Sequence, residues 1–162
     1  MNVKKIVNLN FFNCIRKFMI RLYRNSLFLG DKGKKADKNY IVKCFLYGNH
    51  IENRMETLLN CSRSNTILQF LMRILKKAGI LNKGCQIEMF IFKEYPINSA
   101  ENIALMYTCK YIYNSKFTNE TILCAPFTYA LKFQFSVFSL MGLPQSLIAK
   151  EVLKVLESEL QI

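Results

Sequence analysis

The residues of this chain that could take part in catalysis or metal binding are few and widely spaced. The six cysteines are separated by 15 to 30 residues, so no C-x-x-C pair is present. His50, the only histidine, follows Gly48 and Asn49, which indicates a surface or capping residue rather than a catalytic base. The glycines are too sparse for a phosphate-binding loop. The sequence therefore predicts a protein that is not an enzyme and that binds no metal and no cofactor.

The number of cysteines is even and would permit a disulfide framework. However, a chain of 162 residues that is 51% hydrophobic can bury a core without covalent cross-links. No secretory signal is evident either. We therefore expect reduced thiols, most of them buried in the core.

Positive charge is concentrated in the first part of the chain. Residues 1–93 contain 18 Lys and Arg against 5 Asp and Glu, whereas residues 94–162 contain 5 Lys against 6 Glu. All six arginines lie at or before Arg73. The first part is therefore suited to contact with a polyanion, and the second part to packing or to joining a partner.

Two groups of basic residues are candidates for binding RNA phosphates, because Lys and Arg on loops and helix ends can reach a nucleic-acid backbone. The candidate RNA-binding residues are Lys32, Lys34, Lys35, Lys38, Arg63, Arg73, Lys76, Lys77 and Lys83. The alternative is a solvated surface that is rich in lysine only because of codon composition. That composition is marked, since Phe, Tyr, Met, Ile, Asn and Lys supply 76 of 162 residues, and Gly, Ala, Arg and Pro only 22. It indicates an A/T-rich, organellar gene.

Helices are expected to position most of these residues. Apolar spacing predicts helices over residues 5–29, 51–60, 66–78, 81–92, 100–108, 127–140 and 146–160. Residues 31–38 read as a charged loop, and residues 40–47 as a short strand or a helical turn. Gly79 is expected to cap the helix before it. We expect two regions, a basic N-terminal region over residues 1–65 and a helical domain over residues 66–162.

A β-hairpin is predicted at about residues 110–126, where the apolar period changes. The stretches Lys110–Phe117 and Thr121–Ala125 are rich in β-forming residues and are separated by a turn-like link. The predicted fold class is therefore mainly α, a helical bundle with one β-hairpin and a basic N-terminal extension.

The longest apolar stretch runs from Phe127 to Ala149 and is long enough on paper to cross a bilayer. It contains Lys132 near its start and a break at Gly142–Pro144. These residues favour a buried helix followed by a turn, so we expect no membrane span.

Three features follow one another in the second part of the chain. Residues 67–79 form an apolar helix ending in Lys-Lys-Ala-Gly, followed by Asn-Lys-Gly at residues 82–84. Residues 111–126 form the predicted hairpin ending at a proline, and residues 146–160 form a late leucine-rich helix. In this order, over about residues 66–160, they resemble small-subunit ribosomal protein S-seven in its bacterial and organellar branch.

The resemblance implies a helical bundle with a projecting hairpin that binds ribosomal RNA in the head of the small subunit. The family is arginine-rich after the proline of its hairpin, whereas residues 127–141 of this chain are apolar with one lysine. The apolar C-terminal half is therefore expected to contact neighbouring ribosomal proteins rather than RNA.

The leading prediction is a structural constituent of a mitochondrial small ribosomal subunit, located in the matrix and encoded in the organelle. It would bind ribosomal RNA through its basic N-terminal and central residues, as one member of a large complex. The alternative is an accessory subunit of an inner-membrane respiratory complex. In that case, Phe127–Ala149 would lie in or on the bilayer, and the basic N-terminus would face anionic lipid.

Overall fold

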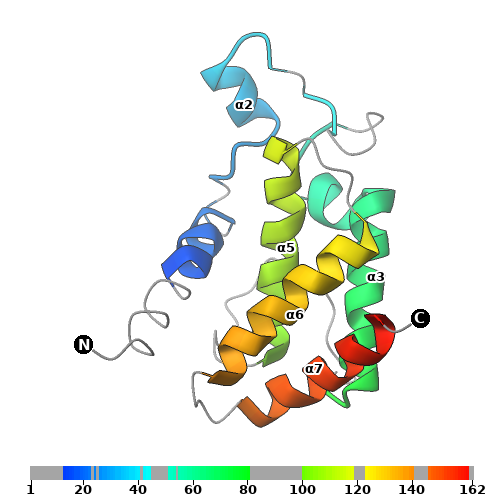
Figure 1. Ribbon diagram of the computed structural model, residues 1–162. Coiled ribbons are helices and arrows are strands. Elements are labelled where there is room, and N and C mark those ends of the chain that lie inside the picture. Colours follow the sequence, from blue (N-terminus) through cyan, green and yellow to red (C-terminus); the bar gives the residue numbers. More distant parts are fainter. Residues whose placement is uncertain are drawn as a thin grey trace.

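Helices account for most of the residues that the structure describes. The computed structural model describes residues 13–22, 24, 26–40, 42–44, 51–53, 55–80, 100–118, 123–140 and 146–160. After a helix over residues 13–22 come α2 (Asp31–Ala36), the π-helical turn η1 (Glu56–Asn60), α3 (Ser62–Lys77), α5 (Ala100–Thr118), α6 (Cys124–Leu140) and α7 (Ser146–Leu160) (Figure 1). The predicted mainly α fold class is confirmed.

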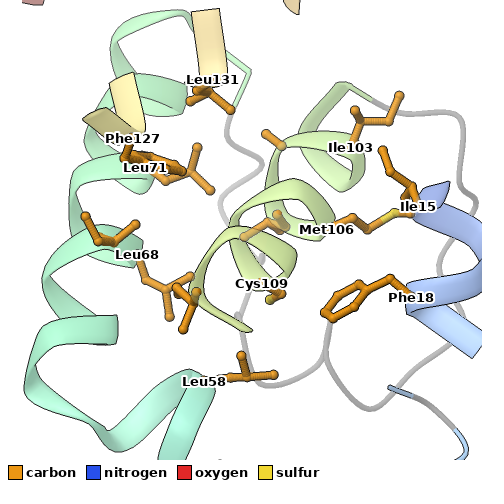
Figure 2. Close-up of a cluster of buried hydrophobic side chains, with 14 of the residues drawn as sticks. Ile15, Phe18, Leu58, Leu68, Leu71, Ile103, Met106, Cys109, Phe127 and Leu131 are labelled. Atoms are coloured by element: carbon orange, nitrogen blue, oxygen red, sulfur yellow. The ribbon is translucent and has the colours of Figure 1, made fainter. Parts of the chain in front are cut away.

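Helix α5 lies at the centre of the core because it is apolar around most of its circumference. Figure 2 shows Met106 of α5 beside Ile15 and Phe18 of the N-terminal helix, with Leu68 and Leu71 of α3 on the opposite side. All five side chains are buried. Burial of each aliphatic or aromatic side chain contributes about 1.5–3 kcal/mol, so these contacts fix α5 between the two helices.

The predicted β-hairpin is wrong, because its first strand belongs to α5. Cys109, Ile112 and Ser115 are spaced three residues apart and are all buried, which is the pattern of one helix face. Burial of that face outweighs the β-propensity of the Tyr, Ile and Phe residues around it. Pro126 lies in the first turn of α6, where backbone N–H groups have no acceptor within the helix. The missing N–H of proline therefore costs no helical hydrogen bond. The expected turn is only partly described, since Thr118 ends α5 and residues 119–122 lie outside the described residues.

Several element boundaries in the first half differ from the prediction. The expected loop at residues 31–38 contains the short helix α2. Ile51 is 69% exposed and its backbone pairs with Lys43 in an isolated antiparallel bridge, so the helix expected to begin there is confined to η1 and its flanking residue. Helix α3 begins at Ser62, and Gly79 after it has a φ of 70°, as expected of a helix cap. The helix expected over residues 81–92 lies outside the described residues.

Helices α6 and α7 pack against each other in front of α3 and α5 (Figure 1). The bounds of α7 agree with the prediction, and its buried Val152 and Leu156 lie on the apolar face that the sequence defines. The apolar stretch Phe127–Ala149 is divided between α6 and α7. Among the described residues, no helix has the length and apolar character needed to cross a membrane.

One hydrophobic core includes residues from both predicted regions. Leu22 and Leu58 belong to the same buried cluster as Leu71, Phe127 and Leu156. The predicted boundary after residue 65 falls within α3. The basic N-terminal residues are therefore carried by segments that share a core with the helices after them.

Candidate nucleic-acid interface

Exposed basic side chains follow one another along residues 13–43, which we call the basic segment. It contains nine Lys and Arg against two Asp, a net charge of +7. The nine basic residues, all exposed, are Arg16, Lys17, Arg21, Arg24, Lys32, Lys34, Lys35, Lys38 and Lys43. Four of them, Lys32, Lys34, Lys35 and Lys38, were predicted from sequence. An exposed group of this charge is suited to contact with phosphates.

The second predicted group is distributed along α3. Arg63 lies in its first turn and Arg73 lies ten residues later, roughly 15 Å further along the helix axis. Lys76 and Lys77 lie in its last turn, where cations interact favourably with the helix dipole. All four side chains are exposed, but Arg63 is separated from the other three. Lys83 lies outside the described residues.

Glu159 of α7 binds two of the predicted RNA-binding residues. One carboxylate oxygen lies 3.1 Å from Nη2 of Arg73, and the other lies 2.5 Å from Nζ of Lys77. The hydrogen bond from Lys77 is the main reason that the pKa of Glu159 is lowered. The side chain of Glu159 is only 11% exposed, although the helical pattern of α7 predicted an outward residue. Glu159 therefore neutralises part of the charge at this end of α3.

An ion pair between Lys116 of α5 and Glu52 ties the basic segment to the core. Nζ of Lys116 lies 2.7 Å from Oε1 of Glu52, and it also donates to the backbone oxygen of Phe28 at 2.9 Å. The hydroxyl of Tyr40 donates to the Glu52 carboxylate and accepts from Lys116. The backbone N–H of Gly30 donates to Oε2 of Glu52 at 3.2 Å. Three residues of the basic segment thus meet one charge pair.

Burial shifts the acid–base behaviour of both charged groups. It raises the pKa of the Glu52 carboxyl to about 7, against a smaller opposing effect of the Gly30 N–H. It also lowers the pKa of the Lys116 ammonium to about 8. The Lys116 ammonium lies 4.5 Å from the ring centroid of Tyr40 and 5.6 Å from that of Phe28, so aromatic faces supply part of its surroundings.

Two glycines allow the close approach of the basic segment to this pair. Gly30 has a φ of 51°, and a Cβ on it would lie 2.0 Å from the backbone oxygen of Glu52. A Cβ on Gly33 would lie 2.4 Å from the ring of Tyr40. A residue with a side chain at either position would push α2 away from the charge pair.

A groove of about 600 Å³ lies along the exposed face of α3, and Cys124 at the start of α6 also lines it. Its lining includes Asn65, Thr66, Gln69, Phe70, Arg73 and Cys124. It thus combines amide, hydroxyl, aromatic and cationic groups, without a carboxylate among its lining residues.

Helix α6 presents an exposed apolar stripe, which we define as Tyr129, Phe133 and Leu140. Their exposed fractions are between 62% and 69%. The spacing of four and seven residues places them on one face of the helix. An exposed stripe of this kind is typical of a surface that another protein covers.

The described cysteines are all free thiols, and four of the five are buried or half-buried. Burial raises the pKa of the Cys109 thiol to about 12, so this sulfur stays protonated and is a poor nucleophile. Among the described residues, no group of three or more His, Cys, Asp or Glu side chains could hold a metal ion. His50 and Cys85 lie outside this part of the chain.

Comparison of the chain with protein-family models, with curated proteins and with solved structures finds no match. The resemblance to ribosomal protein S-seven therefore stays a prediction. Of the segments that suggested it, residues 67–79 and 146–160 include or form helices as expected, and residues 111–118 do not form a strand.

Sequence reasoning missed Glu52, Lys116 and Glu159. For Lys116 a signal exists, because it follows the buried Leu105, Cys109 and Ile112 at helical spacing on the same face of α5. The same signal exists for Glu159, which follows the buried Val152 and Leu156 at helical spacing on one face of α7. For Glu52 we find no such signal, because it lies outside the helices.

Proposed function

We propose that this protein is an RNA-binding structural constituent of a large ribonucleoprotein, namely the small subunit of a mitochondrial ribosome. The observation that carries the proposal is the presence of two exposed surfaces of different chemical character. The basic segment has a net charge of +7, whereas the exposed side chains of the stripe on α6 are apolar. Ribosomal proteins need both kinds of surface, one for RNA and one for neighbouring proteins.

The basic segment supports binding to RNA because its charged side chains are exposed and its backbone is connected to the core. Hydrogen bonds from Gly30 and Tyr40 to Glu52 connect the segment to Lys116 of α5. Charges that are ordered before binding lose less conformational entropy when they meet phosphates. On α3, Arg63 and Lys76 are exposed and have no ion-pair partner among the described residues.

The stripe on α6 supports contact with a neighbouring protein. Phe133 is 65% exposed. In this proposal, neighbouring ribosomal proteins cover Tyr129, Phe133 and Leu140, in agreement with the low charge of the C-terminal half.

Sedimentation of a gentle mitochondrial lysate tests the proposal. The protein is expected to sediment with small-subunit ribosomal RNA and to be released by nuclease or by high salt. Mass spectrometry of the particle should then identify small-subunit ribosomal proteins as its neighbours.

The same fractionation separates the proposal from the alternative of a respiratory-complex subunit. If the protein stays with membranes after a salt wash and is extracted only by detergent, the ribosomal function is wrong. Sedimentation that does not change after nuclease treatment would also contradict it.

A further inference from the structure

The groove along α3 has the dimensions and the chemistry of a ligand site. Its volume of about 600 Å³ lies within the range of pockets that hold small organic groups. Asn65, Gln69 and Arg73 follow one another at intervals of four residues and are exposed on one face of α3. A row of polar side chains on a rigid helix therefore lines the groove, which is not a gap between loops.

Two side-chain amides form one part of the groove. Nε2 of Gln69 donates a hydrogen bond to Oδ1 of Asn65 at 3.3 Å, which orients the two groups relative to each other. The amide N–H groups of Asn65 and the carbonyl oxygen of Gln69 have no partner among the described residues. Amides with both donors and acceptors match the edges of nucleobases, which also present both.

An aromatic ring and a guanidinium form the adjacent part. The guanidinium carbon of Arg73 lies 5.0 Å from the ring centroid of Phe70. Phe70 itself packs edge-on against the buried Phe127, with 6.2 Å between the ring centroids. A half-buried ring beside an arginine is a common platform on which unstacked bases lie.

The charges around the groove are cationic on α3. This helix contains Arg63, Arg73, Lys76 and Lys77 and no acidic residue. Glu159 of α7 takes up part of the charge of Arg73 and Lys77. Arg63 near the start of α3 and Lys76 near its end remain available for phosphates.

We propose that this groove binds one unstacked nucleotide of a single-stranded RNA segment, an inference that rests on the proposed RNA-binding function. The base lies against the Phe70–Arg73 pair, and its edge is hydrogen-bonded by Asn65 and Gln69. Arg63 and Lys76, which lie about 20 Å apart along α3, bind phosphates further along the strand on either side of this nucleotide. The groove thereby adds recognition of an unpaired base to the electrostatic contact made by the basic segment.

The lining favours a nucleotide over other ligands. Most of the exposed lining surface is apolar, which suits the face of a base, and five of the seven lining residues carry hydrogen-bonding side chains that suit its edge. Double-stranded RNA is recognised mainly through its backbone and its shape, so it would make little use of a stacking ring.

Fluorescence anisotropy with the full chain tests the inference directly. The probes are a short labelled single-stranded oligouridylate and an RNA duplex of equal length. The variant Asn65→Ala with Gln69→Ala removes two exposed side chains and no charge. This double variant and the separate variant Phe70→Leu are each expected to weaken binding of the single strand roughly tenfold, while binding of the duplex stays unchanged. Asn114→Ala on the exposed surface of α5 is the matched control and should change neither probe.

The cysteines provide a second readout that does not depend on variants. Cys124 is half-buried and lines the groove, whereas Cys14 is exposed in the basic segment. Saturating single-stranded oligouridylate should slow alkylation of Cys124, as measured by mass spectrometry, and the duplex should not. Alkylation of Cys14 reports contact with the basic segment by either probe.

Failure of the inference can be distinguished from failure of the proposed function. The variant Lys34→Gln with Lys35→Gln should weaken both probes if the basic segment binds RNA. If it does so while the groove variants bind the single strand like the wild type, the groove inference is wrong and the proposed function stands. If neither RNA binds and an unrelated peptide instead slows alkylation of Cys124, both the groove inference and the proposed function are wrong.

Discussion

Lys116 of α5 and Glu52, which lie 64 residues apart in the sequence, form a buried ion pair with 2.7 Å between Nζ and Oε1. Their side chains are 9% and 1% exposed. A buried charge is costly unless its partner and its hydrogen bonds are in place. The pair therefore requires Gly30 and Tyr40 of the basic segment to stay close to α5, and it links the order of that segment to the stability of the core.

At pH 8, above the folded-state pKa of Glu52, the variant Lys116→Met is expected to lower the free energy of unfolding by about 3–5 kcal/mol, because it leaves the Glu52 carboxylate buried without a cation. Urea denaturation followed by circular dichroism measures this loss. The double variant with Glu52→Gln should regain most of the stability, since neither charge then remains buried. Lys150→Met on the exposed side of α7 is the control, and equal midpoints for it and Lys116→Met would contradict the prediction.

Stability should depend on pH through the same pair. The folded-state pKa of Glu52 is raised from 4.5 to about 7, so its contribution is present below pH 4.5 and is lost as the pH rises to 7. The folded-state pKa of Lys116 is lowered from 10.5 to about 8, so its contribution is present above pH 10.5 and is lost as the pH falls to 8.

Together the two shifts predict that the pair contributes least between about pH 7 and pH 8. Unfolding by urea across the pH range, compared with the double variant that lacks both charges, isolates this contribution. The difference between the two proteins should reach an extreme in that interval. A difference that does not vary with pH would show that neither pKa is shifted.

Gly30→Ala should destabilise the contact between the basic segment and Glu52. Its φ of 51° disfavours a side chain, and the added Cβ would lie 2.0 Å from the Glu52 backbone oxygen. We expect a loss of at least about 2 kcal/mol in the free energy of unfolding. Gly79→Ala is the matched control, because its φ of 70° is similar but nothing lies within 4 Å of the added Cβ. It should cost only about 1 kcal/mol, and equal costs would mean that the close approach at Gly30 is unimportant.

The helices that a sequence pattern predicts well are those with one clear apolar face. In α7, Val152 and Leu156 are buried while Lys150, Glu151 and Lys154 are exposed, and both ends of this helix were predicted correctly. Helix α5 is buried or half-buried around most of its circumference, and the polar Ser115 and Lys116 occupy such positions, so a hydrophobic pattern does not mark one face of it. Its second half was therefore predicted as a strand from local propensity.

The residues of the candidate site that only need to be exposed could be predicted from sequence. The contacts between residues far apart in the sequence could not. The lysines of residues 32–38 are exposed as expected of a charged segment, whatever its secondary structure. The pairing of Glu159 with Arg73 and Lys77 joins residues more than 80 positions apart. No local pattern encodes such a contact. The sequence therefore did not predict that Glu159 partly neutralises two of the candidate phosphate-binding residues.

Glu159→Gln should have opposite effects on stability and on RNA affinity. Loss of the two ion pairs is expected to lower the free energy of unfolding by about 0.5–1 kcal/mol. Release of Arg73 and Lys77 should strengthen binding of RNA at low salt and steepen its salt dependence, as measured by anisotropy titrations. Glu157→Gln is the control, because Glu157 is exposed and pairs with Lys132 at 3.3 Å rather than with α3. Weaker RNA binding by Glu159→Gln would show that Glu159 orders the two cations for RNA instead of competing with it.

Phe133→Glu tests whether the stripe on α6 is a protein contact. Phe133 is 65% exposed, so the substitution should change the free energy of unfolding by less than about 0.5 kcal/mol. Burial of a charge in an apolar interface is unfavourable, and loss of an aromatic anchor typically costs at least about 2 kcal/mol of binding. The fraction of the protein that sediments with the ribonucleoprotein should therefore fall steeply, while binding to isolated RNA stays unchanged.

Leu123→Glu is the matched control for this variant, because Leu123 is 54% exposed but lies outside both the stripe and the basic segment. It should leave sedimentation with the particle unchanged. If Phe133→Glu also sediments like the wild type, the stripe is not covered by a neighbouring protein. If both variants are lost from the particle, added negative charge is the cause, because repulsion from RNA acts on any surface near the phosphates. Loss of Phe133→Glu alone, with RNA affinity intact, would place the protein partner on α6 and leave the basic segment to the RNA.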